Sequence, residues 1–259
     1  MKLPAPVATL VVAFSMYSAL PMPQIAWTPQ NMRYALVAFP LVGGFIGLVC
    51  WGCVALCDWL HLPDLVRGAA LTVVPVLLTG GIHLDGFADT CDARASHGEP
   101  LERQRILKDP HLGAFAAIRL GCYFVATLAL WTALPHYAPL LVTLMFMFER
   151  ALSVLALTVV PLAKNTGLAH TFVSAAHKER VRWLLLALSV LLAGAMVLVG
   201  GVEGGAAVAA AGGVGVYYYR MALREFGGLS GDLAGWFVQV VEVWMLFALC
   251  AVQWVEAVL

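Results

Sequence analysis

The stretch LLTGGIHLDGFADTCDARASHGEP, residues 77–100, runs from an apolar segment into a cluster that contains Asp85, Asp89 and Asp92. The chain as a whole is poor in charge, because 62% of its 259 residues are hydrophobic and only 12% are charged. Soluble domains carry about 25% charged residues. The composition therefore predicts an all-α, polytopic membrane helix bundle that forms one membrane-embedded catalytic domain over residues 1–259. The net charge of zero gives no sign of a nucleic-acid partner.

Apolar runs on both sides of this stretch are long enough to cross a bilayer, which takes roughly 20 residues per helix. We expect seven to eight transmembrane helices, at about 4–20, 35–57, 66–82, 112–134, 138–160, 183–201, 205–221 and 233–256. The first run is short and interrupted by proline, and Lys2 before it also suits a signal peptide. No small-x-small cleavage site follows, so we expect a short, tilted first span.

Among the loops of this scheme, basic residues occur only in alternate ones. They are Arg33; Arg94, Arg103, Arg105 and Lys108; Lys164, Lys178, Arg180 and Arg182; and Arg220 and Arg224. The positive-inside rule places these loops in the cytoplasm, with both chain termini on the opposite side. The acidic cluster then faces the cytoplasm.

The three aspartates have the spacing of one helix face. A helix that starts after GGIH carries Asp85, Asp89 and Asp92 at i, i+4 and i+7, within a stripe of roughly 60°. Oxygen ligands of this kind favour Mg²⁺, with Mn²⁺ as a second choice, and Mg²⁺ usually combines one or two carboxylates with substrate phosphates. The alternative is a solvated segment whose acids only balance the arginines that follow. His83, just before the stripe, either orients a carboxylate or phosphate or is a plain interfacial side chain.

Two further segments are expected at the same face. LKDPHLGAFAA, residues 107–117, contains Asp109, and REFGGLSGDLAGW, residues 224–236, contains Gly231 and Asp232. Glycine-rich backbone before a helix presents free N–H groups that suit phosphate. A plain turn, with Ser230 or Asp232 as the helix N-cap, is the alternative.

Charged side chains also occur inside the expected spans. Glu149 and Arg150 lie near the middle of one, and Glu242 lies in the last. A charge at the centre of a bilayer costs about 2.5–3.5 kcal/mol on insertion scales. Such residues are either functional or paired inside the bundle, for example Arg150 with Glu242.

Five stretches, in order along the chain, resemble the cobalamin synthase family, the adenosylcobinamide-GDP ribazoletransferases. They are FPLVGGFIG (39–47), GGIHLDGFADTCDA (80–93), KDPHLGAFA (108–116), GLAHTF (167–172) and GGLSGDLAGW (227–236). The second is the most specific. Ala93 departs from the glycine usual in the family, and Leu229-Ser230 departs from its polar residue and threonine, but neither change removes a carboxylate.

The resemblance implies an enzyme of the bacterial inner membrane that joins adenosylcobinamide-GDP to α-ribazole or α-ribazole 5′-phosphate and releases GMP. It implies Mg²⁺ on Asp85, Asp89 and Asp92, and a general base at Asp92 or Asp232. Arg150 or Lys164 would clamp the diphosphate, and His83, Asp109 and Gly231 would contact substrate.

Three questions stay open at this point. A CDP-alcohol phosphotransferase has a loosely similar acidic motif, although the further spaced aspartates of that motif are missing here. A transporter would use Glu149, Arg150 and Glu242 as a relay. Small residues in the spans permit close helix packing within one chain or in an oligomer.

Overall fold

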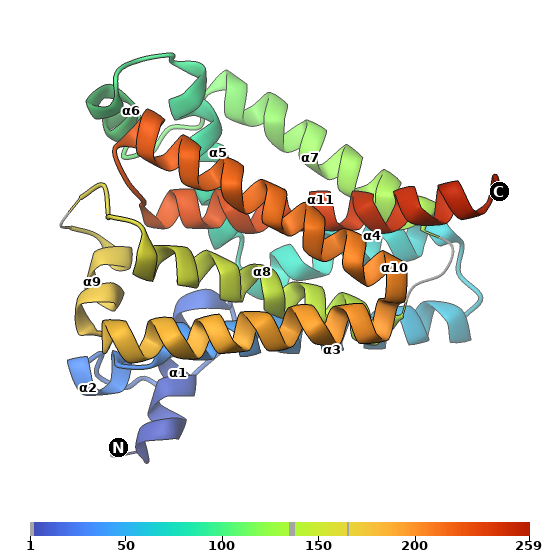
Figure 1. Cartoon of the computed structure of the whole chain (residues 1–259), viewed down its shortest axis with the longest axis horizontal. Coiled ribbons are helices and arrows are strands. Elements are labelled where there is room, and N and C mark those ends of the chain that lie inside the picture. The colour runs from blue at the N-terminus through green and yellow to red at the C-terminus, as the bar shows by residue number, and fades with distance from the viewer. Residues whose placement is uncertain (1–2, 135–137, 165) are drawn as a thin grey trace.

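Long apolar helices run side by side through most of the molecule, as the sequence predicts (Figure 1). The structure is a computed structural model that describes residues 3–134, 138–164 and 166–259. Within these residues, five helices are long and apolar enough to cross a membrane. They are α3 (Ala35–Trp59), α7 (Ala114–Ala133), α8 (Pro139–Val159), α10 (Lys178–Phe226) and α11 (Gly231–Glu256).

Helix α10 contains two of the predicted spans. Its 49 residues are interrupted at Gly201, whose backbone angles (φ 51°, ψ −122°) are not helical. Figure 1 shows the two arms of α10 running in opposite directions from this bend. The predicted spans at 183–201 and 205–221 are therefore two crossings joined by a tight glycine turn.

Helices α4 (Asp64–Thr79) and α5 (Ile82–Ala95) form a sharply bent pair, with 95° between their axes. Gly80 and Gly81 form the bend, and both have positive φ (65° and 79°), a conformation that glycine adopts without strain. Because of this turn α4 runs with the bundle, whereas α5 leaves that direction and lies across one end of the bundle (Figure 1). The acidic stretch thus lies beyond the bend. Among the described residues, dividing α10 at Gly201 gives six apolar crossings, and the bent pair of α4 and α5 is a candidate for a seventh.

The predicted eighth span, 4–20, is not supported. Helix α1 (Ala5–Tyr17) has 13 residues, about 20 Å of helix, which is shorter than the roughly 30 Å hydrocarbon core. It lies across the bundle near α2 (Pro29–Met32) and α9 (Leu168–Ala175), whereas the C-terminus lies at the other end (Figure 1). The expectation that both termini lie opposite the basic loops therefore holds for the C-terminus only.

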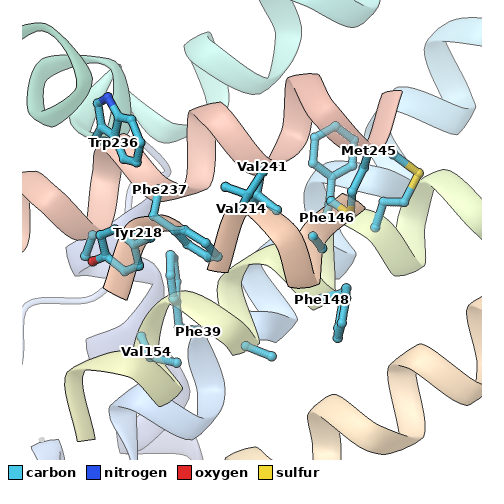
Figure 2. Close-up of a cluster of buried hydrophobic side chains, with 14 of the residues drawn as sticks. Phe39, Phe146, Phe148, Val154, Val214, Tyr218, Trp236, Phe237, Val241 and Met245 are labelled. Carbon is cyan, nitrogen blue, oxygen red and sulfur yellow. The ribbon is translucent and has the colours of Figure 1, made fainter. Parts of the chain in front are cut away.

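The core lies where α3, α8, α10 and α11 meet. Figure 2 shows aromatic and aliphatic side chains from these four helices in one buried cluster. The rings of Tyr218 and Phe237 are stacked, with 4.6 Å between their centroids. Helix α3 can approach α8 closely because Gly43 has no side chain. A Cβ at this position would lie only 2.1 Å from the carbonyl oxygen of Phe146. The short helix α6 (Pro100–Ile106) packs against α5 and α10 at one end of the bundle.

Candidate active site

The acidic helix α5 crosses the first turns of α11 with almost no space between the two backbones. A Cβ on Gly86 would lie 2.6 Å from the carbonyl oxygen of Asp232, and one on Gly235 would lie 3.1 Å from that of His83. Since larger residues would separate the helices, these two glycines bring Asp232 beside Asp85 and Asp89. The sequence pattern predicted Asp85 and Asp89 on one helix face, but it did not predict how Asp232 comes to lie beside them.

The carboxylates are close enough to affect one another's ionisation. Burial, followed by the negative charges of Asp85, Asp232 and Asp92, raises the pKa of Asp89 from 3.8 to about 7. The arginines of the same segment do not neutralise this charge, because Arg94 binds Glu225 of α10 (Nε to Oε2, 2.9 Å). Arg103 binds the same glutamate. The interpretation that the acids only balance these arginines is therefore not supported.

Asp92 has a different environment from the other two members of the predicted stripe. Its Oδ2 accepts a hydrogen bond from the backbone N–H of Gly113 (2.7 Å), and its Oδ1 accepts one from Ala116 (2.8 Å). These are free N–H groups at the start of α7, so Asp92 caps this helix from across the fold. A Cβ on Gly113 would lie 2.5 Å from the carboxylate, which explains the glycine at that position.

The residues present fit Mg²⁺, but with fewer aspartate ligands than the three that the sequence suggested. Among the described residues, no group of three or more His, Cys, Asp or Glu side chains is arranged to hold a metal ion. Mg²⁺ usually needs only one or two carboxylates, because waters and phosphates supply its other ligands. Asp85 and Asp89, one helical turn apart and beside Asp232, meet that requirement. The assignment of Asp92 as a ligand stays a prediction, and its hydrogen bonds to α7 argue against it.

Two loops complete the site through a short backbone pairing. Leu229 donates its N–H to Pro161 (2.8 Å) and accepts one from Ala163 (2.8 Å), so residues 227–230 are tied to residues 160–164. The pairing holds Lys164 near Asp232. The Nζ of Lys164 donates a hydrogen bond to the carbonyl oxygen of Gln104 (2.6 Å). Burial and the charge of Lys108 lower the pKa of Lys164.

Helix α11 begins with a side-chain cap, as one of the two sequence interpretations expected. Ser230 is the N-cap, and its hydroxyl accepts a hydrogen bond from Leu233 (3.2 Å). A cap at this position does not exclude phosphate binding, because Gly231 also lines the cavity described next.

A cavity of about 460 Å³ opens between α1, α3, α5, α8, α9 and α11. We call it the chamber. Its lining includes five of the predicted site residues: His83, Asp85, Lys164, Gly231 and Asp232. The other four, Asp89, Asp92, Asp109 and Arg150, are absent from its lining. Of these, Asp109 is exposed and forms a hydrogen bond with the ring Nδ1 of His111 (2.7 Å), so its predicted substrate contact is not supported by its position.

Arg150 and Glu149 form a buried ion pair inside the bundle, with side chains that are 1% and 0% exposed. Arg150 also donates to the carbonyl oxygen of Phe146 (3.0 Å), and its guanidinium lies 5.8 Å from the ring centroid of Phe39. Interior pairing is thus observed, but the partner is Glu149. Glu242 lines the same small cavity as Arg150, about 10 Å³, which is near the minimum for one water molecule.

A family model described as cobalamin-5-phosphate synthase matches residues 9–250. The chain belongs to this family. The adenosylcobinamide-GDP ribazoletransferase of Lachnoclostridium phytofermentans is 39% identical over 235 residues, 91% of this chain and 90% of the relative. The proteins of the same name from Stutzerimonas stutzeri A1501 and Clostridium botulinum Alaska E43 are 31% and 30% identical, and each match covers 93% of this chain and 96% of the relative. No solved structure matches the chain.

Membership of the cobalamin-5-phosphate synthase family favours neither the CDP-alcohol phosphotransferase nor the transporter alternative. It also agrees with where the five resembling stretches lie, since each contributes a residue to the chamber or its rim. Several of the lining residues in the quoted stretches, including Phe39, Lys108 and Phe172, are not among the predicted site residues. Tyr17, which also lines the chamber, has no sequence signal of its own.

Proposed function

We propose that this protein is an adenosylcobinamide-GDP ribazoletransferase. It transfers adenosylcobinamide phosphate to α-ribazole or its 5′-phosphate and releases GMP. The observation that supports this most is the chamber, in which Asp85 and Asp232 lie with Lys108 and Lys164 in a chain of this family. Carboxylates beside lysines suit a diphosphate substrate that also brings a divalent cation.

Mg²⁺ fits beside Asp85 and Asp89, and Mn²⁺ has the same ligand preference. When bound, the ion neutralises charge on the diphosphate and on the departing phosphate. It also accounts for a cluster of carboxylates that otherwise oppose one another's ionisation, as the raised pKa of Asp89 shows.

The side chains of the chamber position the substrates and stabilise the charge that develops, which are the main contributions to catalysis of phosphoryl transfer. Lys164 and Lys108 bind phosphate oxygens, and Gly231 at the start of α11 offers backbone N–H. Asp232 accepts the proton of the attacking ribose hydroxyl. The oxygen of that ribose hydroxyl forms the new bond to the cobinamide-linked phosphorus as the bond from that phosphorus to GMP breaks. Asp232 suits this role better than Asp92, because both oxygens of Asp92 already bind α7.

We place the enzyme in the bacterial inner membrane with the chamber facing the cytoplasm. The chamber lies at the end of the bundle where α2, α6 and α9 gather, the same end as the basic loops (Figure 1). The positive-inside rule favours a cytoplasmic position for those loops. The description of the family, cobalamin-5-phosphate synthase, favours the phosphorylated riboside as the acceptor.

Release of GMP by the purified protein in detergent tests this proposal directly. We expect turnover of adenosylcobinamide-GDP with α-ribazole 5′-phosphate, loss of turnover in EDTA and recovery with Mg²⁺. Asp85→Ala and Asp89→Ala should each abolish most turnover, whereas Asp58→Ala, an exposed aspartate at the far end of α3, should not. Absence of GMP release by the unmodified protein would refute the function, and full activity of Asp85→Ala would refute the assigned metal site.

A further inference from the structure

One part of the chamber is not explained by phosphate chemistry. Tyr17, Phe39, His83 and Phe172 come from four different helices and line the chamber together. The ring centroids of Tyr17 and Phe39 are 4.1 Å apart, those of Phe39 and His83 are 5.5 Å apart, and those of Tyr17 and Phe172 are 6.2 Å apart. We call these four residues the aromatic wall.

The aromatic wall offers very few polar groups. Phe39 and Phe172 are buried, and the aliphatic residues Leu36, Val154 and Leu157 lie in the same lining. His83 is only 6% exposed, and its Nε2 has no hydrogen-bond partner within the described part of the chain. A ligand at this wall would therefore meet mainly apolar surfaces, with the imidazole nitrogen of His83 and the hydroxyl of Tyr17 as the polar groups.

We propose that the aromatic wall binds the flat, apolar two-ring base of the riboside acceptor, with its ribose directed toward Asp85 and Asp232. This assignment rests on the proposed function, and it gives the two substrates different parts of one site. Bases stack on aromatic side chains whatever their hydrogen-bonding edges. The ribose hydroxyl would then lie on the same side as the carboxylates that act on it.

The size and polarity of the chamber favour this occupant over the parts of the donor. Cavities of about 300–1,000 Å³ bind drug-sized ligands, a class that includes a two-ring base with its ribose. A chamber of about 460 Å³ is too small for a corrinoid. Guanine has several polar groups along its edge, and the aromatic wall would leave most of them without hydrogen bonds, which is costly.

The assignment also gives α1 a role. Tyr17 ends this helix, and Met16 beside it lines the same chamber. Because α1 lies across the bundle, its last turn can close the chamber beside Phe39 (Figure 1). The N-terminal helix is then part of the acceptor site and not a membrane anchor alone.

Binding of α-ribazole to the full chain in detergent, measured by equilibrium dialysis, tests the inference. Ala169→Phe places a ring in the chamber from α9, and Thr171→Phe places one on the exposed side of the same short helix as a matched control. We expect Ala169→Phe to weaken α-ribazole binding at least about tenfold and Thr171→Phe to leave it within about twofold. Phe172→Leu, which keeps apolar volume but removes the ring, should weaken binding about tenfold.

Steady-state kinetics separate the alternatives. The KM for the acceptor should rise in Ala169→Phe and Phe172→Leu, whereas the KM for adenosylcobinamide-GDP should stay within about twofold of the unmodified value. A rise confined to the donor KM would overturn the inference and leave the proposed function intact, as would binding of adenosine as tight as that of α-ribazole. Tight α-ribazole binding without any GMP release would instead retain the acceptor site and refute the transfer reaction.

Discussion

Replacing Asp92 with alanine should destabilise the fold more than it changes the chemistry. The substitution removes two hydrogen bonds, of 2.7 and 2.8 Å, from an ionised acceptor to the start of α7. A hydrogen bond to a charged group contributes about 1.5–3 kcal/mol, and loss of a helix cap costs about 0.5–2 kcal/mol. Because water replaces part of the lost interaction, we expect a loss of about 2–4 kcal/mol. For a chain of this length that is a fall in Tm of roughly 5–15 °C.

Thermal unfolding in detergent measures this effect, and two glycines of the same region supply the controls. Gly113→Ala should lower the Tm as well, because its Cβ would lie 2.5 Å from the carboxylate of Asp92. Gly121→Ala in the same helix meets open space and should leave the Tm unchanged or slightly higher. Asp85→Ala, at an exposed position, should unfold like the unmodified protein. If Asp92→Ala keeps its Tm and loses GMP release, Asp92 acts on the substrate or metal and the capping argument is wrong.

Three further predictions concern charge and orientation. The pKa of Asp89 is raised from 3.8 to about 7, so its ionisation opposes folding increasingly between about pH 4 and pH 7. In EDTA, Asp89→Asn should therefore raise the Tm at about pH 8 and lose this advantage near pH 4; an equal gain at both values would contradict the assignment. Arg150→Met should cost about 3–5 kcal/mol by leaving Glu149 buried and unpaired, and the double variant with Glu149→Gln should recover much of the Tm. A double variant as unstable as the single one would show that the pair itself is not the cause. In a cysteine-free background, Leu101→Cys on α6 should react with an impermeant thiol reagent only from the cytoplasmic side and Leu62→Cys only from outside, and the reverse result would invert the proposed orientation.

The spanning helices were predictable because hydropathy is a local property of the sequence. The runs around α3, α7, α8 and α11 have a high mean hydropathy and few charged residues, and the acidic helix α5 begins directly after a pair of glycines. Packing against a distant segment leaves no such local pattern. The sequence therefore predicted the residues of the acidic helix but not that Gly86 and Gly235 bring Asp232 to it.

Individual side-chain partners were the least predictable part of the site. Asp92 and Asp85 have the same chemistry and lie two turns apart on one helix, yet only Asp92 meets the start of α7. Pairing with Glu242 across the bundle was one of the alternatives for Arg150, but this residue binds its neighbour Glu149. Adjacent residues in a helix do not usually face each other, so no spacing rule would have indicated this pair.

The contact between α5 and α11 also has a consequence for the order in which the protein is made. Gly86 and Asp232, whose backbones touch, are 146 residues apart in the chain. At about 5–20 residues per second, a ribosome needs roughly 7–30 s to synthesise the segment between them. During that time α5 has no α11 against its glycine face, and its aspartates have no Asp232 beside them. The acidic site is thus assembled only with the last helix, and a chain that ends before α11 would have inserted most of its helices without ever having formed the site.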